Sequence, residues 1–145
     1  MDLSSPDFQN NGTIPSEFTC DGKKYNPNLE IKNVPPGAKS LVLIVDDPDA
    51  PGKTFVHWLV FNIAPTTIKI AKNSIPGKEG INDGRKRGYF PPAPPSGTHR
   101  YFFKLYALDA ELNLPDGVTK DKLEIAMQGH VIGKAELIGL YKRSG

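Results

Sequence analysis

The sequence predicts a mainly β protein, a β-sandwich with one or two short helices. Three observations lead to this fold class. Several apolar segments have the length and pattern of strands, only one segment has a convincing helical pattern, and turn residues separate these segments throughout. The 14 glycines and 14 prolines make up about a fifth of the 145 residues. Turn residues spread along a chain in this way are typical of many short strands.

Two strands are predicted in the first half of the chain. Residues 41–45 form a β-branched run that is apolar on both faces, which is typical of a central, fully buried strand. Residues 55–63 form a second strand. A two-residue period places His57 on the same face as Phe55, Leu59 and Phe61.

The second half is predicted to hold two more strands and a helix. Residues 99–108 form a strand with His99, Tyr101 and Phe103 on one face, and residues 135–141 form the last strand. Between them, residues 119–128 form the only good helix candidate, capped by Thr119.

The bulk properties predict a single domain, residues 1–145, and exclude several classes of protein. A net charge of +2 argues against a dedicated nucleic-acid-binding protein. Cys20 is the only cysteine, so no disulfide framework is expected. The N-terminal residues lack a signal-peptide pattern, and no apolar run is long enough for stable membrane insertion. We therefore expect a cytoplasmic protein.

Ionisable or phenolic side chains interrupt three of the apolar strand faces. Asp47 continues the face of Leu41 and Leu43, while His57, His99 and Tyr101 lie on the faces described above. Burying even a neutral polar group without a partner costs on the order of 2–7 kcal/mol. We therefore expect these groups to lie at strand ends, close to one another, and to be paired with one another or with a ligand.

Several chemistries remain open for this polar cluster. In the simplest, Asp47 accepts a hydrogen bond from a histidine and the network is purely structural. Alternatively, the cluster forms a small anion pocket, in which a neighbouring Asp keeps a histidine cationic and Tyr101 adds a hydroxyl donor. A metal site or a metal-dependent hydrolase is less favoured, because the two histidines lack the spacing of a metal motif. His130 fits no cluster.

Prolines stiffen both loops beside the cluster. Pro51 follows Asp47 and Asp49, and residues 91–95 contain four prolines, including Pro94 and Pro95. The tight first loop favours a cis peptide bond before Pro51, although only about 5–6% of X–Pro bonds in folded proteins are cis.

These motifs resemble those of the phosphatidylethanolamine-binding protein family, also called the Raf-kinase-inhibitor-like family. Asp47-Pro48-Asp49-Ala50-Pro51 resembles its first motif, with His57-Trp58 following, and Gly97-Thr98-His99-Arg100-Tyr101 resembles its second. The resemblance extends from about Leu3 to Arg143 and is greatest to the short prokaryotic branch. The chain departs from the family pattern at Pro91, where a glycine is usual, and at Ala93, where a cysteine is usual.

The resemblance implies two antiparallel sheets with Greek-key connections and a small pocket for phosphate, acetate or phosphorylethanolamine groups. The implied ligand-binding residues are Asp47, His57, His99, Tyr101 and, at the rim, Pro51. The implied supporting residues are Asp49, Trp58, Arg100, Pro94 and Pro95.

The resemblance also implies a non-catalytic, regulatory binding protein without a cofactor. The alternative is an inhibitor that acts on a protease or a kinase through its surface. A homodimer is a further option for a short member of the family, although no patch in the sequence supports it.

Overall fold

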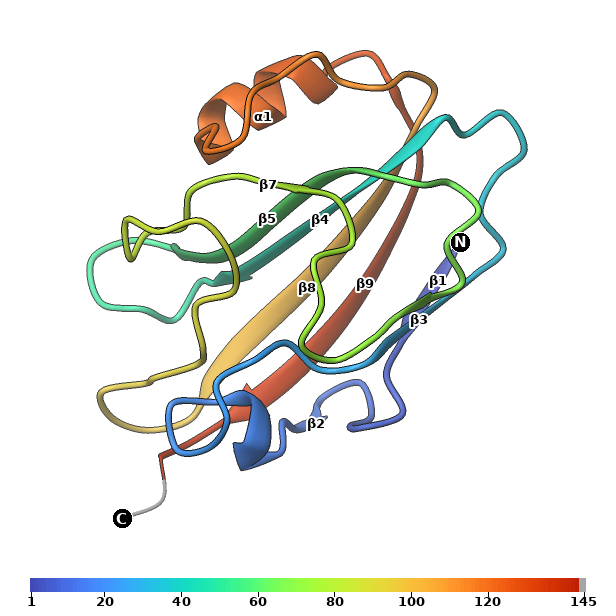
Figure 1. The fold of residues 1–145 in the computed structure, drawn as a ribbon. Helices are drawn as coiled ribbons and strands as arrows, with labels where there is room; N and C mark the ends of the chain where they lie inside the picture. Colours follow the sequence, from blue (N-terminus) through green and yellow to red (C-terminus); the bar gives the residue numbers. More distant parts are fainter. Residues whose placement is uncertain (144–145) are drawn as a thin grey trace.

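The computed structural model describes residues 1–143 and shows two β-sheets packed on each other, with a helix on the outer side of the larger sheet (Figure 1). The predicted β-sandwich is therefore confirmed. The strands are β1 (Asp2–Ser4), β2 (Gly12–Thr13), β3 (Leu29–Lys32), β4 (Ser40–Asp47), β5 (Phe55–Ile63), β6 (Lys69–Ile70), β7 (Lys78–Glu79), β8 (His99–Leu108) and β9 (Val131–Tyr141). The helices are α1 (Lys120–Met127) and a single 3₁₀ turn, Ser16–Phe18. Within residues 1–143, no helix is both long and apolar enough to cross a membrane.

The larger sheet has six strands in the order β2-β9-β8-β4-β5-β7, and the smaller sheet has the order β1-β3-β6. The four long strands β9, β8, β4 and β5 pair antiparallel, as expected. The short β2 differs, because it pairs parallel with β9. The strand expected at 135–141 starts earlier, at Val131.

The central strand β4 separates two apolar cores. Leu41, Leu43 and Val45 point into the core between the two sheets. Val42 and Ile44 point to the other face, where they belong to a second cluster that includes Leu123 of α1. All of these side chains are buried, because both faces of β4 are covered. Coverage of both faces explains why residues 41–45 form an uninterrupted apolar run.

The two-residue period expected along β5 is wrong, because the strand contains irregularities. Val45 pairs with Trp58 and the next residue, Asp46, pairs with Val56, so His57 is an extra residue in the ladder. Such a bulge shifts the following side chains to the opposite face. As a result, Leu59 and Phe61 lie in the cluster beneath α1 instead of sharing a face with His57.

A second irregularity in β5 lies near its end, at Asn62. The ladder pairs Leu43 with Val60 and Leu41 with Ile63, which again leaves one extra residue on β5. Asn62 has a left-handed backbone with φ of 54°. Its amide Nδ2 donates to the carbonyl of Leu112 at 2.8 Å, and the Leu112 N–H donates to Oδ1 at 2.8 Å. The bulge therefore holds the segment between β8 and α1.

The expected cis peptide bond before Pro51 is also wrong, because residues 1–143 contain no cis peptide bond. The loop after β4 reverses instead at Gly52, which has φ of 85°. Glycine adopts this left-handed conformation without the steric penalty of a Cβ atom, so the turn closes with a trans proline.

Substitutions at Asn62 test the role of the second bulge. We expect Asn62→Ala to lower the free energy of unfolding by about 2–3 kcal/mol, because two hydrogen bonds are lost and alanine is strained at positive φ. Asn62→Gly loses the same bonds but relieves the strain, so its loss should be about 1 kcal/mol smaller. Urea unfolding measures both values. Equal losses for the two variants would contradict the strain assigned to this position.

Candidate functional site

The candidate site is a cavity of ≈ 120 Å³ at one end of the larger sheet. Because β4 runs antiparallel to β5 and β8, its last residue, Asp47, lies beside their first residues, Phe55 and His99. The lining residues come from these strand ends and from the two proline-containing loops. They are Asp47, Ala50, Pro51, Phe55, His57, Phe90, Ala93, Pro94, Pro95, His99 and Tyr101. The structure thus brings together all five residues predicted to bind a ligand, and their binding role stays a prediction.

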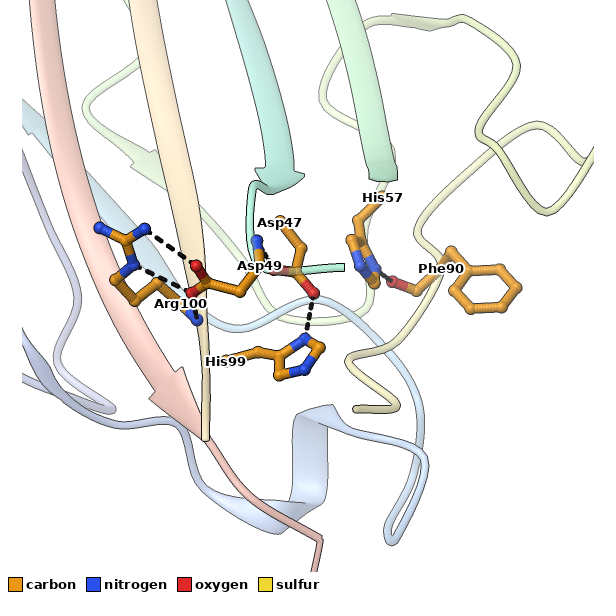
Figure 2. A network of polar contacts seen from close by, with 6 residues as sticks. All are labelled: Asp47, Asp49, His57, Phe90, His99 and Arg100. Carbon is orange, nitrogen blue, oxygen red and sulfur yellow. Dashed lines mark hydrogen bonds and ion pairs between the residues drawn. The ribbon is translucent and has the colours of Figure 1, made fainter. Parts of the chain in front are cut away.

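Asp47 and His99 form a buried hydrogen-bonded pair in the floor of the cavity (Figure 2). The His99 Nδ1–H donates to Asp47 Oδ2 at 2.7 Å. The other carboxylate oxygen, Oδ1, accepts the backbone N–H of Asp49 at 2.8 Å. Both oxygens of Asp47 are therefore engaged by the protein, and the carboxylate fixes the orientation of the His99 ring and of the following loop.

His57 is held by the opposite loop. Its Nδ1 lies 2.7 Å from the carbonyl oxygen of Phe90 (Figure 2), and the Phe90 N–H donates to the His57 carbonyl at 2.8 Å. A carbonyl oxygen only accepts hydrogen bonds, so Nδ1 carries the proton. In the described chain, no protein atom hydrogen-bonds to Nε2 of His57 or of His99.

From the sequence, a histidine beside Asp47 was expected to be cationic. The surroundings of His57 favour the neutral ring instead. Burial lowers the pKa of the His57 imidazole, and the hydrogen bond to the Phe90 carbonyl and then the carboxylate of Asp47 oppose this effect less strongly. Desolvation penalises the cationic ring more than the nearby charge stabilises it. His57 is therefore neutral at pH 7, with an unprotonated Nε2.

Tyr101 lies against the histidines. Its ring meets that of His57 edge-on, with ring centroids 5.2 Å apart and an interplanar angle of 81°. The hydroxyl is buried and, among the described residues, has no hydrogen-bond partner. Burial also raises the pKa of the Tyr101 hydroxyl, so the group is a neutral donor.

Asp49 and Arg100 clamp the first loop to the start of β8 (Figure 2). The Arg100 backbone N–H and Nε both donate to Asp49 Oδ2 at 2.9 Å, and Nη2 donates to Oδ1 at 2.9 Å. These hydrogen bonds lower the pKa of the Asp49 carboxyl to about 2. Arg100 is half exposed and does not line the cavity, and its supporting role stays a prediction.

The walls of the cavity are largely apolar. Pro51, Pro94 and Pro95 are among the lining residues, and their rim and supporting roles stay predictions. The rings of Phe55 and Phe90 pack near His57 in a tilted arrangement, with their centroids 5.2 Å apart and an interplanar angle of 55°. Neither phenylalanine was predicted as a site residue from the sequence. The two-residue spacing from Phe55 to His57 could have identified Phe55, whereas Phe90 contacts His57 through its backbone, which no residue pattern reveals.

Some residues considered from the sequence lie outside the cavity. Trp58 is fully buried in the sandwich core, where its Nε1–H donates to Glu79 at 2.7 Å. Of the two departures from the family pattern, Ala93 lines the cavity and Pro91 does not. His130 pairs with Asp109 on the surface. In residues 1–143, no three His, Cys, Asp or Glu side chains gather as potential metal ligands.

The clamp predicts how Asp49 titrates. Its folded pKa of about 2 lies below the usual value of about 3.9. The carboxylate therefore stabilises the fold above about pH 4, and this contribution is lost as the pH falls to about 2. We expect Arg100→Gln to raise the Asp49 pKa measured by carboxyl ¹³C NMR.

A matched control for this titration is Arg87→Gln, because Arg87 pairs instead with Asp116, at 3.8 Å. This control should leave the Asp49 pKa unchanged. An unaltered Asp49 pKa in Arg100→Gln would rule out the clamp as the cause of the low value.

Known proteins with similar sequences and structures support the motif assignment. A family model described as phosphatidylethanolamine-binding protein matches residues 4–142. A protein of Methanothermobacter thermautotrophicus designated UPF0098 is 48% identical over 151 residues, covering 99% of both chains. A protein of Aquifex aeolicus with the same designation is 45% identical over 152 residues, covering 99% of this chain and 89% of the relative.

Two crystal structures have the same fold. A phosphatidylethanolamine-binding protein homologue from Chlamydia trachomatis has a TM-score of 0.96 and 42% identity, covering 99% of this chain and 97% of that one. YbcL of E. coli, described as a member of the mammalian family, has a TM-score of 0.90 and 26% identity, covering 99% and 98% of the two chains. The fold, the motifs and these matches show that the chain belongs to the phosphatidylethanolamine-binding protein family.

Proposed function

We propose that this protein is a non-catalytic, regulatory binding protein whose cavity takes a small anionic or phosphorylated group. The observation that carries the proposal is the buried Tyr101 hydroxyl, which lies beside two histidines and has no hydrogen-bond partner within residues 1–143. A buried polar group left unpaired costs about 1–3 kcal/mol. A ligand oxygen that accepts from this hydroxyl would offset that cost.

The dimensions and lining of the cavity fit a small group with a polar end. A single water needs roughly 10–15 Å³ by the same measure, so a cavity of ≈ 120 Å³ has room for several heavy atoms. Its histidines offer Nε2 atoms near the floor, while the prolines and phenylalanines give apolar walls. The family is named for binding phosphatidylethanolamine, a lipid with a phosphate group, which accords with such a ligand.

The arrangement supports binding more than catalysis. Both oxygens of Asp47 are engaged by the protein, so the carboxylate orients His99 instead of facing a substrate. Among the described residues, the cavity lining includes no serine, threonine, cysteine or lysine that could act as a nucleophile. Histidine and tyrosine are thus the groups left to contact a ligand, as donors or acceptors.

A titration followed by histidine ring NMR signals tests the proposal. With inorganic phosphate and with phosphorylethanolamine, we expect the His57 and His99 signals to shift saturably. His130 serves as the internal control, because it pairs with Asp109 outside the cavity. If neither cavity histidine responds at millimolar ligand, the anion pocket is wrong, and inhibition of proteases and kinases should be assayed next.

Replacing Tyr101 with phenylalanine separates a binding role from a structural one. We expect Tyr101→Phe to keep or raise the stability of the free protein, by up to about 1 kcal/mol, because an unpaired buried hydroxyl is removed. Phosphate affinity should fall several-fold, since a donor is lost. Thermal unfolding and the NMR titration measure the two effects. Unchanged affinity together with reduced stability would assign the hydroxyl a purely structural role.

A further inference from the structure

The cavity offers an anion unusually little positive charge. Among residues 1–143, its lining includes no lysine or arginine. Arg100, beside His99 at the start of β8, directs its guanidinium to Asp49 through two hydrogen bonds of 2.9 Å. The charge of Arg143 reaches Tyr101, but its Nε donates to Cys20 at 3.4 Å, and Arg143 does not line the cavity. Meanwhile Asp47 places a buried carboxylate in the floor. An anion that enters therefore meets a carboxylate and two histidines, and the protonation of the histidines decides whether it is attracted.

Backbone contacts fix which His57 nitrogen faces the ligand. Because the Phe90 carbonyl accepts from Nδ1–H, the remaining nitrogen, Nε2, has a lone pair when the ring is neutral. Nε2 then accepts hydrogen bonds but donates none. A fully deprotonated oxyanion also only accepts, so two acceptors would face each other. One proton between them converts this repulsive contact into a charge-assisted hydrogen bond.

The surroundings of His57 keep its ring neutral until an anion arrives. Burial is the largest influence and lowers the pKa of the imidazole. Asp47, His99 and Tyr101 line the cavity together with the ring. The charges of Asp46 and Asp83 also reach the ring, although Asp46 pairs with Lys104 and Lys120, and Asp83 accepts the Val56 N–H. The hydrogen bond to the Phe90 carbonyl and the three carboxylates favour the protonated ring, but less than burial opposes it. An anion bound at Nε2 would add its negative charge to that of the carboxylates, which favours the protonated form of His57.

We propose that the pocket takes up one proton together with its anion and shares it between the anion and Nε2 of His57. This inference rests on the proposed function, and it names the class of ligand. Weak-acid oxyanions, such as phosphate and phosphomonoesters, bring the proton themselves near neutral pH. Strong-acid oxyanions such as sulfate bind only after His57 has taken a proton from water.

Sulfate is the most direct probe of protonation of the protein, because sulfate itself does not titrate in the neutral pH range. Free His57 has a pKa below the usual value of about 6.5, so at pH 7.5 at most about one tenth of it is protonated. We expect sulfate affinity to fall at least tenfold between pH 5.5 and pH 7.5, and phosphate affinity to change much less. Calorimetry in two buffers of different ionisation enthalpy should show that sulfate binding at pH 7.5 takes up about one proton.

The variant that isolates His57 is His57→Asn. The Asn amide N–H₂ can donate to the Phe90 carbonyl in place of Nδ1–H, whereas nothing replaces Nε2. We expect the pH dependence of sulfate affinity to flatten in this variant. His130→Asn, outside the cavity, should behave like the unmodified protein.

The outcomes separate this inference from the proposed function. Sulfate that shifts the His57 and His99 signals with the same affinity at pH 5.5 and 7.5 would overturn proton uptake and leave the anion pocket standing. A pH dependence that persists in His57→Asn would assign the proton to another group and also overturn it. If neither phosphate nor sulfate shifts these signals, the proposed function falls, and the inference with it. The number of protons that the unmodified protein takes up on binding sulfate, measured by calorimetry, tests the inference even if His57→Asn does not fold.

Discussion

The site depends on one buried carboxylate, that of Asp47. It ends the most buried strand of the sandwich, where it accepts from His99 on one oxygen and from the Asp49 backbone on the other. A buried charge is tolerated only when it is paired and hydrogen-bonded, and breaking such a pair costs about 3–5 kcal/mol. The first loop and the start of β8 are therefore tied to β4 at one point, and the ring of His99 is oriented by the same contact.

The rest of the cavity follows from the strand geometry around that point. Antiparallel pairing brings the starts of β5 and β8 beside the end of β4, and the bulge at His57 turns its ring toward the cavity while Leu59 points beneath α1. The Phe90 backbone then fixes the His57 ring from the opposite loop. Outside, the Asp49–Arg100 clamp ties the first loop to β8 and directs the guanidinium to Asp49. The result is a cavity with largely apolar walls, whose lining includes the hydrogen-bonded carboxylate of Asp47.

Much of this arrangement could be predicted from the sequence, and the failures have physical causes. The run at residues 41–45 predicted a strand buried on both faces, and β4 has that environment. Asp47, His57, His99 and Tyr101 were expected to meet because isolated buried polar groups are unfavourable, and all four line one cavity. The bulges at His57 and Asn62 could not be predicted from the sequence, because they depend on the pairing of β5 with β4, which no local pattern encodes. Strands as short as β2 and β6 are defined by their partners alone. The neutral state of His57 depends on how deeply the fold buries it, which spacing does not reveal.

The measurement that tests this account most directly is a long-range ¹H–¹⁵N NMR correlation of the histidine rings in the unliganded protein at pH 7.5. We predict that His57 is neutral, with its proton on Nδ1 and a ¹⁵N shift typical of an unprotonated nitrogen at Nε2. We also predict a hydrogen-bonded proton on Nδ1 of His99. A His57 ring that is doubly protonated, or that carries its proton on Nε2, would contradict the account. The cavity would then present a donor where the structure places an acceptor.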